Sequence, residues 1–120
     1  MTREQMVDAL YQRTPLFVPP ESFAHTLRDW ELDTVEVGGK PAFITAKRGP
    51  EFHFQSLDPG NIISRTMIRE FLRPIIAAHG YATTRTPKDD IRQQRFNERY
   101  GFLMTAADDE YVTYSIRQVR

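Results

Sequence analysis

The stretch from Glu51 to Gly80 constrains the fold more than any other part of this chain. Residues 51 to 57 alternate in polarity, a turn follows at Asp58-Pro59-Gly60-Asn61, and the longest amphipathic pattern of the sequence comes next. Its apolar residues recur at spacings of three and four, as in a helix packed on a sheet: Ile63, Met67, Ile68, Phe71, Leu72, Ile75 and Ile76. Pro74 predicts a kink or a break in this helix, and Gly80 predicts its end.

A strand that runs through a glycine-containing turn into a helix creates a site for an anion. The first backbone N–H groups of a helix lack partners within it, and the positive end of the helix dipole adds to their attraction. Here those groups belong to the turn and to the residues that follow it, up to Arg65. The segment therefore predicts a phosphate-binding site.

The segments before this unit predict two helices and then two strands. We expect helices over residues 3 to 12 and from residue 20 onward, the second capped by Ser22, with an extended connector over residues 14 to 20. The buried side of the second helix is expected to carry Phe23, Leu27 and Trp30. Strands follow over residues 32 to 37 and 41 to 47, joined by a tight turn at Gly38-Gly39. In the second strand, Ala42, Ile44 and Ala46 alternate with Phe43 and Thr45.

The segments after Gly80 predict a parallel crossover and a final hairpin. A strand over residues 81 to 86 would pair in parallel with the strand of residues 51 to 57, because a helix connects them. A further helix from Asp89 and Asp90 to Arg99 ends at Gly101, with its apolar side predicted at Ile91, Phe96 and Tyr100. Strands over residues 102 to 107 and 111 to 116 follow.

Composition indicates a single ordinary globular domain over residues 1 to 120, with helices in residues 1 to 30 and the sheet in residues 31 to 118. Sixteen basic and sixteen acidic residues cancel, which argues against nucleic acid or a membrane surface as a partner. The sequence contains no cysteine and no long apolar run, so we expect a soluble, cytoplasmic protein. Three histidines without close spacing predict no metal site.

One segment near the end of the chain resembles a known family. The residues Phe96-Asn97-Glu98-Arg99-Tyr100-Gly101-Phe102, followed by Asp109-Glu110-Tyr111-Val112, are similar to the signature of the GNAT (Gcn5-related N-acetyltransferase) superfamily. The order of elements over residues 31 to 118 is similar as well. The resemblance implies an α/β fold with a mixed, mostly antiparallel central sheet of about six strands flanked by four helices. The small size of this chain and its local sequence Arg95-Phe96-Asn97 look closest to the GNAT-like proteins of T7-like tailed phages.

The resemblance also implies a site for acyl-CoA between the strands of residues 51 to 57 and 81 to 86. The pantetheine would pair with backbone at Phe54, Gln55, Ser56 and Leu57, and the pyrophosphate would lie on Gly60, Asn61, Ser64 and Arg65. The turn departs from the family pattern, since it has one glycine, an acidic residue and a proline. Asn97 aligns with the family's general-acid tyrosine and would contact the cofactor there, but an amide cannot deliver the proton.

Two side chains could act as the general base of such a reaction. Glu51 and His53 lie on one face of their predicted strand, and either could take a proton from an attacking amine. The alternative is that this face is only the polar side of a half-buried strand. Two basic rows, one of Arg65, Arg69 and Arg73 and one of Arg92, Arg95 and Arg99, could attract an anionic cofactor or partner, or could be solvated helix faces.

These observations leave two hypotheses for the function. The first is an N-acyltransferase that moves an acetyl group from acetyl-CoA to an amine, such as a protein lysine or N-terminus. The second is a catalytically silent GNAT-fold phage protein, a virion component or an inhibitor that binds a host protein in the host cytoplasm. Glu51 and His53 favour the enzyme, whereas the turn at Asp58 and the amide of Asn97 favour the binding protein.

Overall fold

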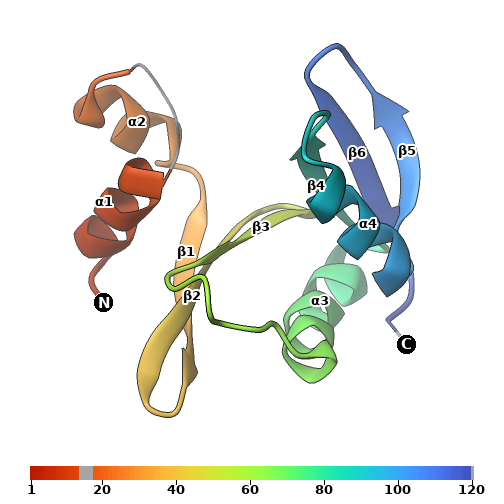
Figure 1. The fold of residues 1–120 in the computed structure, drawn as a ribbon, viewed down its shortest axis with the longest axis horizontal. Coiled ribbons are helices and arrows are strands. Elements are labelled where there is room, and N and C mark those ends of the chain that lie inside the picture. The colour runs from red at the N-terminus through yellow and green to blue at the C-terminus, as the bar shows by residue number, and fades with distance from the viewer. Residues whose placement is uncertain (14–17, 120) are drawn as a thin grey trace. The chain divides into compact units, whose positions relative to one another are not determined.

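The computed structural model describes residues 1 to 13 and 18 to 119, and in them it confirms the predicted α/β fold of four helices and six strands (Figure 1). The elements are α1 (Arg3–Arg13), α2 (Pro20–Thr26), β1 (Glu31–Val37), β2 (Lys40–Arg48), β3 (Glu51–Ser56), α3 (Arg65–His79), β4 (Ala82–Pro87), α4 (Ile91–Tyr100), β5 (Leu103–Ala107) and β6 (Tyr111–Ile116). The strands form one mixed, mostly antiparallel sheet in the order β1-β2-β3-β4-β6-β5. No helix in the described part of the chain is long and apolar enough to span a membrane.

The chain divides into two compact units. The first contains Met1–Arg48 and His53–Ile62, and the second contains Gly49–Phe52 and Ile63–Arg120. Strand β3 contributes its first two residues to the second unit and the rest to the first.

In the first unit, β1 and β2 form the predicted antiparallel hairpin. Gly38 and Gly39 have φ angles of 63° and 80°, a backbone region that favours glycine, so the tight turn depends on both. The predicted alternation of burial along β2 is wrong, because the five consecutive residues from Ala42 to Ala46 are all buried. The hydroxyl of Thr45 accordingly donates to the carbonyl oxygen of Asp33, at 3.3 Å.

The two N-terminal helices form close to their predicted positions. Helix α1 runs one residue further than predicted. The cap predicted at Ser22 is wrong, because α2 starts at Pro20, its N-cap is Pro19, and no side chain caps it. This helix ends at Thr26, so Leu27 and Trp30 lie beyond it; Phe23 is its buried residue. The predicted connector falls in part on residues 14 to 17, outside the described residues.

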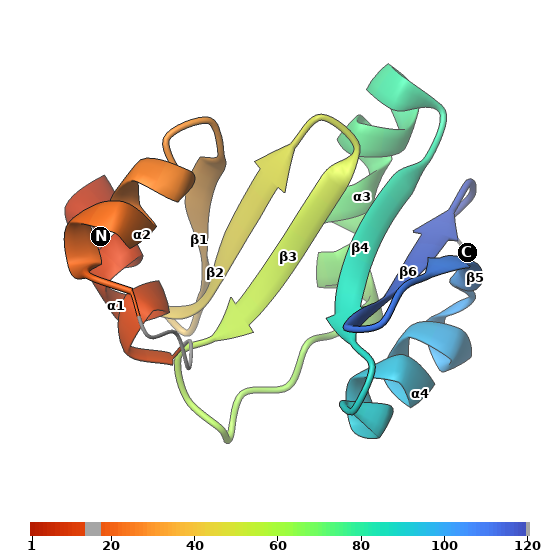
Figure 2. The same ribbon diagram turned by 90° about the horizontal axis from the view of Figure 1, so that it is seen from above.

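In the second unit, α3 is the predicted long helix. It runs without a break through Pro74, so the predicted break is wrong, while a kink there stays a prediction. Its buried residues include Leu72, which is 0% exposed, and Gly80 ends it with a φ angle of 84°. The predicted parallel pairing of β3 with β4 is confirmed at Glu51 and Thr83 (Figure 2).

Helix α4 and the last hairpin complete the second unit. Asp90 caps α4 by accepting from the backbone N–H of Gln93, at 3.1 Å. The apolar side predicted for this helix is partly wrong, because Ile91 is exposed and the buried residue is Asn97. Strand β6 pairs antiparallel with both β4 and β5.

Two side chains of the last hairpin have perturbed acidities. Burial, together with the hydrogen bond from its hydroxyl to Glu98, raises the pKa of Tyr114. The backbone N–H groups of Tyr111 and Glu110 donate to the carboxylate of Asp108 and hold its pKa below the usual value. Asp108 therefore stays ionised and fixes the turn between β5 and β6.

Candidate functional site

The two candidate bases come from β3 but belong to different compact units. Glu51 lies in the second unit and His53 in the first, and both are partly exposed, whereas Phe52 between them is buried. This pattern agrees with the predicted alternation of side chains along the strand.

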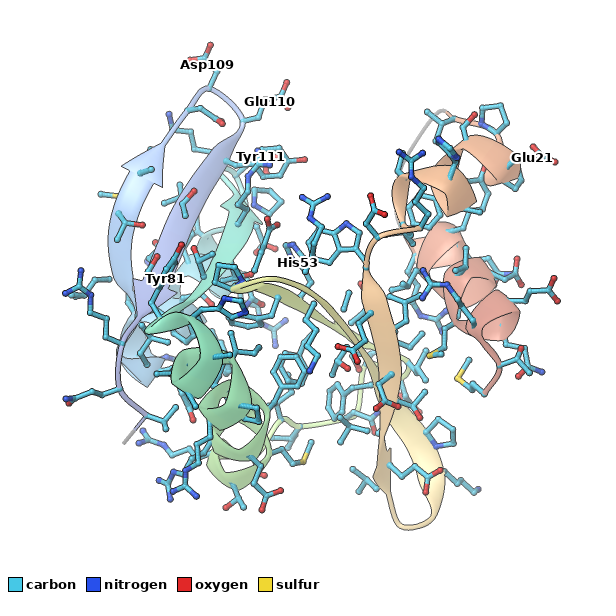
Figure 3. The ribbon with its side chains drawn as sticks, turned by 180° about the vertical axis from the view of Figure 1, so that it is seen from behind. Glu21, His53, Tyr81, Asp109, Glu110 and Tyr111 are labelled. Atoms are coloured by element: carbon cyan, nitrogen blue, oxygen red, sulfur yellow. The ribbon has the colours of Figure 1, made fainter. Side chains whose placement is uncertain are left out.

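His53 is also part of an aromatic cluster in the first unit. Its ring centroid lies 5.3 Å from that of Trp30, and the guanidinium of Arg48 lies 4.6 Å from the Trp30 centroid. Figure 3 shows the His53 side chain extending from β3. A ring contact at this distance contributes packing energy, so the residue has a structural role besides any chemical one.

The turn after β3 is held by its own hydrogen bonds. A carboxylate oxygen of Asp58 accepts from the N–H of Gly60 at 2.9 Å, and the Asp58 carbonyl accepts from the N–H of Asn61 at 3.0 Å. The hydroxyl of Ser56 donates to the same carbonyl at 2.5 Å. Two N–H groups predicted to hold a pyrophosphate are thus already paired, and a carboxylate lies beside them. The Asp58-Pro59-Gly60 pattern is a signal for this kind of turn, since aspartate often bonds the backbone two residues on.

Further bonds hold both ends of this turn in the first unit. The side-chain amide of Asn61 donates to the carbonyl of Ala42 at 2.8 Å, and the same carbonyl accepts from the N–H of Leu57 at 2.9 Å. The guanidinium of Arg13 donates to the Leu57 carbonyl at 3.0 Å. Both polar groups of the Leu57 peptide are therefore engaged within the protein.

The start of α3, in the second unit, has more of the features that suit an anion than the turn before it. The hydroxyl of Ser64 accepts from the N–H of Met67 at 3.1 Å, which leaves the N–H groups of Arg65 and Thr66 without a partner inside the helix. The helix dipole and the exposed guanidinium of Arg65 both favour negative charge at this point.

The same helix start is connected to α4 through Tyr100. The Tyr100 hydroxyl donates to the carbonyl of Arg65 at 3.1 Å. Burial raises the pKa of Tyr100, and the guanidinium groups of Arg69 and Arg65 partly oppose that shift. Their influence indicates that two members of the predicted basic row act on the same tyrosine. Nothing in the sequence pattern predicted this connection.

Loss of the cap at Ser64 should destabilise the start of α3. We expect Ser64→Ala to lower the free energy of unfolding by about 1 kcal/mol, the usual cost of removing an N-cap side chain. Ser64→Asp should restore most of it, because a carboxylate caps as well as a hydroxyl. Urea denaturation of the three proteins measures the effect. Equal stability of the alanine variant and the original chain would contradict the role of this bond.

Asn97 occupies a buried position rather than an open one. Its side chain is 3% exposed, donates to the Thr86 hydroxyl at 2.9 Å, and accepts from the side-chain amide of Gln93 at 3.1 Å. Its carbonyl also accepts from the N–H of Phe102 at 3.0 Å. The residue therefore ties α4 to β4, and its direct contact with a cofactor stays a prediction.

The second basic row lies along the exposed side of α4. Arg92, Arg95 and Arg99 line a shallow depression together with Ile91 and Glu98. The first row is less uniform, since Arg65 and Arg73 are exposed while Arg69 is partly buried. The described residues contain no cluster of histidine and acidic side chains that could hold a metal ion.

Comparison with known proteins gives a clear result for structure and none for sequence. No protein-family model and no curated protein matches the sequence. The N-acetyltransferase PseH of Campylobacter jejuni superposes with a TM-score of 0.71 at 8% identity, over 98% of this chain and 92% of that protein. An acetyltransferase of the GNAT family from Streptococcus pneumoniae gives a TM-score of 0.60 at 9% identity, over 93% and 89% of the two chains. The chain has the GNAT fold.

The GNAT fold also relates this chain to a structure with a bound cofactor. PseH in complex with acetyl coenzyme A superposes with a TM-score of 0.70 at 9% identity, over 98% of this chain and 93% of that one. Identities this low establish the fold alone.

Proposed function

We propose that this chain is an acyl-CoA-dependent N-acyltransferase, which moves an acetyl group from acetyl-CoA to an amine such as a protein lysine or N-terminus. One observation carries the proposal: the GNAT fold extends over 98% of the chain, and a structural neighbour is solved with acetyl-CoA. The capped start of α3 supports it, because it suits a pyrophosphate.

Both backbone groups and side chains would bind the cofactor in this proposal. The N–H groups at Arg65 and Thr66 and the Arg65 guanidinium would hold the pyrophosphate. The backbone of Phe54, Gln55 and Ser56 would pair with the amides of the pantetheine, as an added strand does. Leu57 is left out of this assignment, since both its polar backbone groups are bonded within the protein.

The chemical step requires a base and no covalent intermediate on the enzyme. Bound acyl-CoA would supply a thioester carbonyl that an amine can attack directly. The carbon–sulfur bond would then break, and CoA would leave as a thiolate that takes its proton from water. His53 or Glu51 would accept the proton that the amine loses, either directly or through water. The chain has no cysteine that could carry the acyl group, which agrees with direct transfer.

A second candidate function is supported by the turn at Asp58. Because Asp58 occupies the N–H groups of Gly60 and Asn61, this turn offers fewer donors to a pyrophosphate than a glycine-rich loop would. The second candidate is therefore a silent GNAT-fold protein of a phage, which acts in a virion or by binding a host protein. Such a protein would not require acyl-CoA.

Thermal melting distinguishes the two candidates. Acetyl-CoA at a hundred times its dissociation constant should add about 2.7 kcal/mol to the stability of the enzyme, which raises the melting temperature by several degrees. Free CoA should give a similar shift, because the pyrophosphate is common to both. Absence of a shift at millimolar ligand would favour the silent protein.

A pair of arginine variants makes this test specific to the start of α3. Arg65→Ala should remove most of the shift, whereas Arg73→Ala should keep it, since Arg73 is an exposed residue two turns further along the same helix. Both variants lose one positive charge, so overall electrostatics is matched. Equal shifts in both variants would contradict the assignment of the pyrophosphate to Arg65.

A further inference from the structure

Strand β5 is an unusually unprotected edge of the sheet. Its five residues, Leu103–Ala107, are all exposed, and its one partner in the strand order is β6. Leu103 is 73% exposed and Met104 is 64% exposed. An apolar edge strand presents unpaired backbone groups to any strand that can approach it.

The strand at the other end of the strand order differs in chemistry. Strand β1 carries three acidic residues, Glu31, Asp33 and Glu36, which discourage pairing by charge. Strand β5 has no charged residue, no proline and no glycine. A β-bulge between Met104 and Ala106 gives it some protection, because a bulge interrupts the pairing along the edge.

From these features we propose that β5 pairs antiparallel with β5 of a second copy of this chain. The two ends of the strand support self-pairing in that direction. Large side chains, Leu103 and Met104, occupy its start, and small ones, Ala106 and Ala107, occupy its end. Antiparallel pairing centred on Thr105 places the large residues of one copy against the small residues of the other.

Charge around the strand favours the same direction. The acidic turn of Asp108, Asp109 and Glu110 follows its end, and Figure 3 shows Asp109 and Glu110 at the tip of this hairpin. Near its start lies Arg117, because Leu103 pairs with Ser115 and both Leu103 and Arg117 line one groove. Antiparallel pairing brings the acidic end of each copy toward the basic end of the other, whereas parallel pairing would bring like charges together.

The pairing is expected to be weak. The bulge at Thr105 divides the strand into two short stretches, and a contact of five residues per copy falls below the area of a standard stable interface. The dimer should therefore form in a concentration-dependent way. It rests on the second unit alone and does not depend on the proposed activity.

Sedimentation equilibrium of the whole chain over a range of concentrations tests the proposal. The mass should rise from monomer to dimer, and Leu103→Glu should weaken the dimer by at least about tenfold, because antiparallel pairing places the new carboxylate of each copy beside the acidic turn of the other. Val37→Glu is the matched control: Val37 is another exposed apolar strand residue, on β1. Circular dichroism verifies that both variants fold. A monomer at every concentration, or equal weakening by both variants, would overturn the proposal.

Cross-linking gives a second test, because the chain contains no cysteine. Facing residues of antiparallel strands lie at distances that a disulfide can span. Thr105→Cys should therefore form a disulfide-linked dimer under mild oxidation, and Val37→Cys should not. Equal yields of linked dimer from the two variants would overturn the proposed centre of pairing.

Discussion

Asn97→Ala is expected to lower the free energy of unfolding by about 2 to 3 kcal/mol. The variant removes the acceptor of Gln93 and the donor to Thr86, whose side chain lies at a position that is 2% exposed. A buried polar group left without its partner costs about 1 to 3 kcal/mol, and the lost volume adds a cavity. Urea denaturation monitored by circular dichroism measures the change.

The neighbouring residue Arg95 provides the control for this prediction. It is exposed on the same helix, so Arg95→Ala should change the stability by no more than about 0.5 kcal/mol. Thr86→Val isolates one of these hydrogen bonds, because it removes the hydroxyl to which the side-chain amide of Asn97 donates. If Asn97→Ala is as stable as Arg95→Ala, the buried hydrogen bonds of Asn97 contribute little to the free energy of unfolding, and the prediction is wrong.

The parts of the fold that could be predicted from the sequence are those set by local backbone chemistry. Gly38 and Gly39 marked the hairpin, Gly80 and Gly101 ended the two helices, and Asp90 preceded the second of them. At each of these positions a turn or a cap depends on one or two residues. Local rules were therefore sufficient there.

The parts that could not be predicted depend on what packs against each element. Burial of both faces of β2 was missed, although the run from Ala42 to Ala46 is apolar except for Thr45, a pattern typical of a strand that is covered on both faces. Ile91 was predicted on the apolar side of α4, yet Asn97 takes the buried position because Thr86 and Gln93 satisfy its amide. Thr86 lies on β4 and Gln93 lies one helical turn earlier on α4, so the sequence alone did not identify them as partners of Asn97.

The candidate site was predictable to a similar degree. Ser64 and Arg65 were predicted from the turn before a helix, and the structure adds the cap that leaves N–H groups available. The hydrogen bonds of Asp58 were not predicted, although they decide how many donors the turn can offer. Side-chain bonds to backbone compete with ligands for the same N–H groups.

His53 is the residue whose replacement should affect the proposed activity most. If it is the base, His53→Phe should lower kcat by about 10²- to 10⁴-fold, the usual contribution of a positioned acid or base. Phenylalanine keeps an aromatic ring against Trp30, where the His53 centroid lies 5.3 Å away, but cannot accept a proton. The rate of acetyl transfer to an amine, measured by release of free CoA, tests this prediction.

Two further variants decide between His53 and Glu51. Glu51→Gln removes the other candidate base with little change of shape, so the larger loss of kcat identifies the base. His53→Ala removes both the ring contact and the proton acceptor, and it should match His53→Phe in kcat while being less stable by about 0.5 to 1.5 kcal/mol. In every variant the melting shift with acetyl-CoA should persist, because neither side chain is assigned to the pyrophosphate. Full turnover in His53→Phe would exclude His53 as the base, and full turnover in both His53→Phe and Glu51→Gln would require a base outside β3.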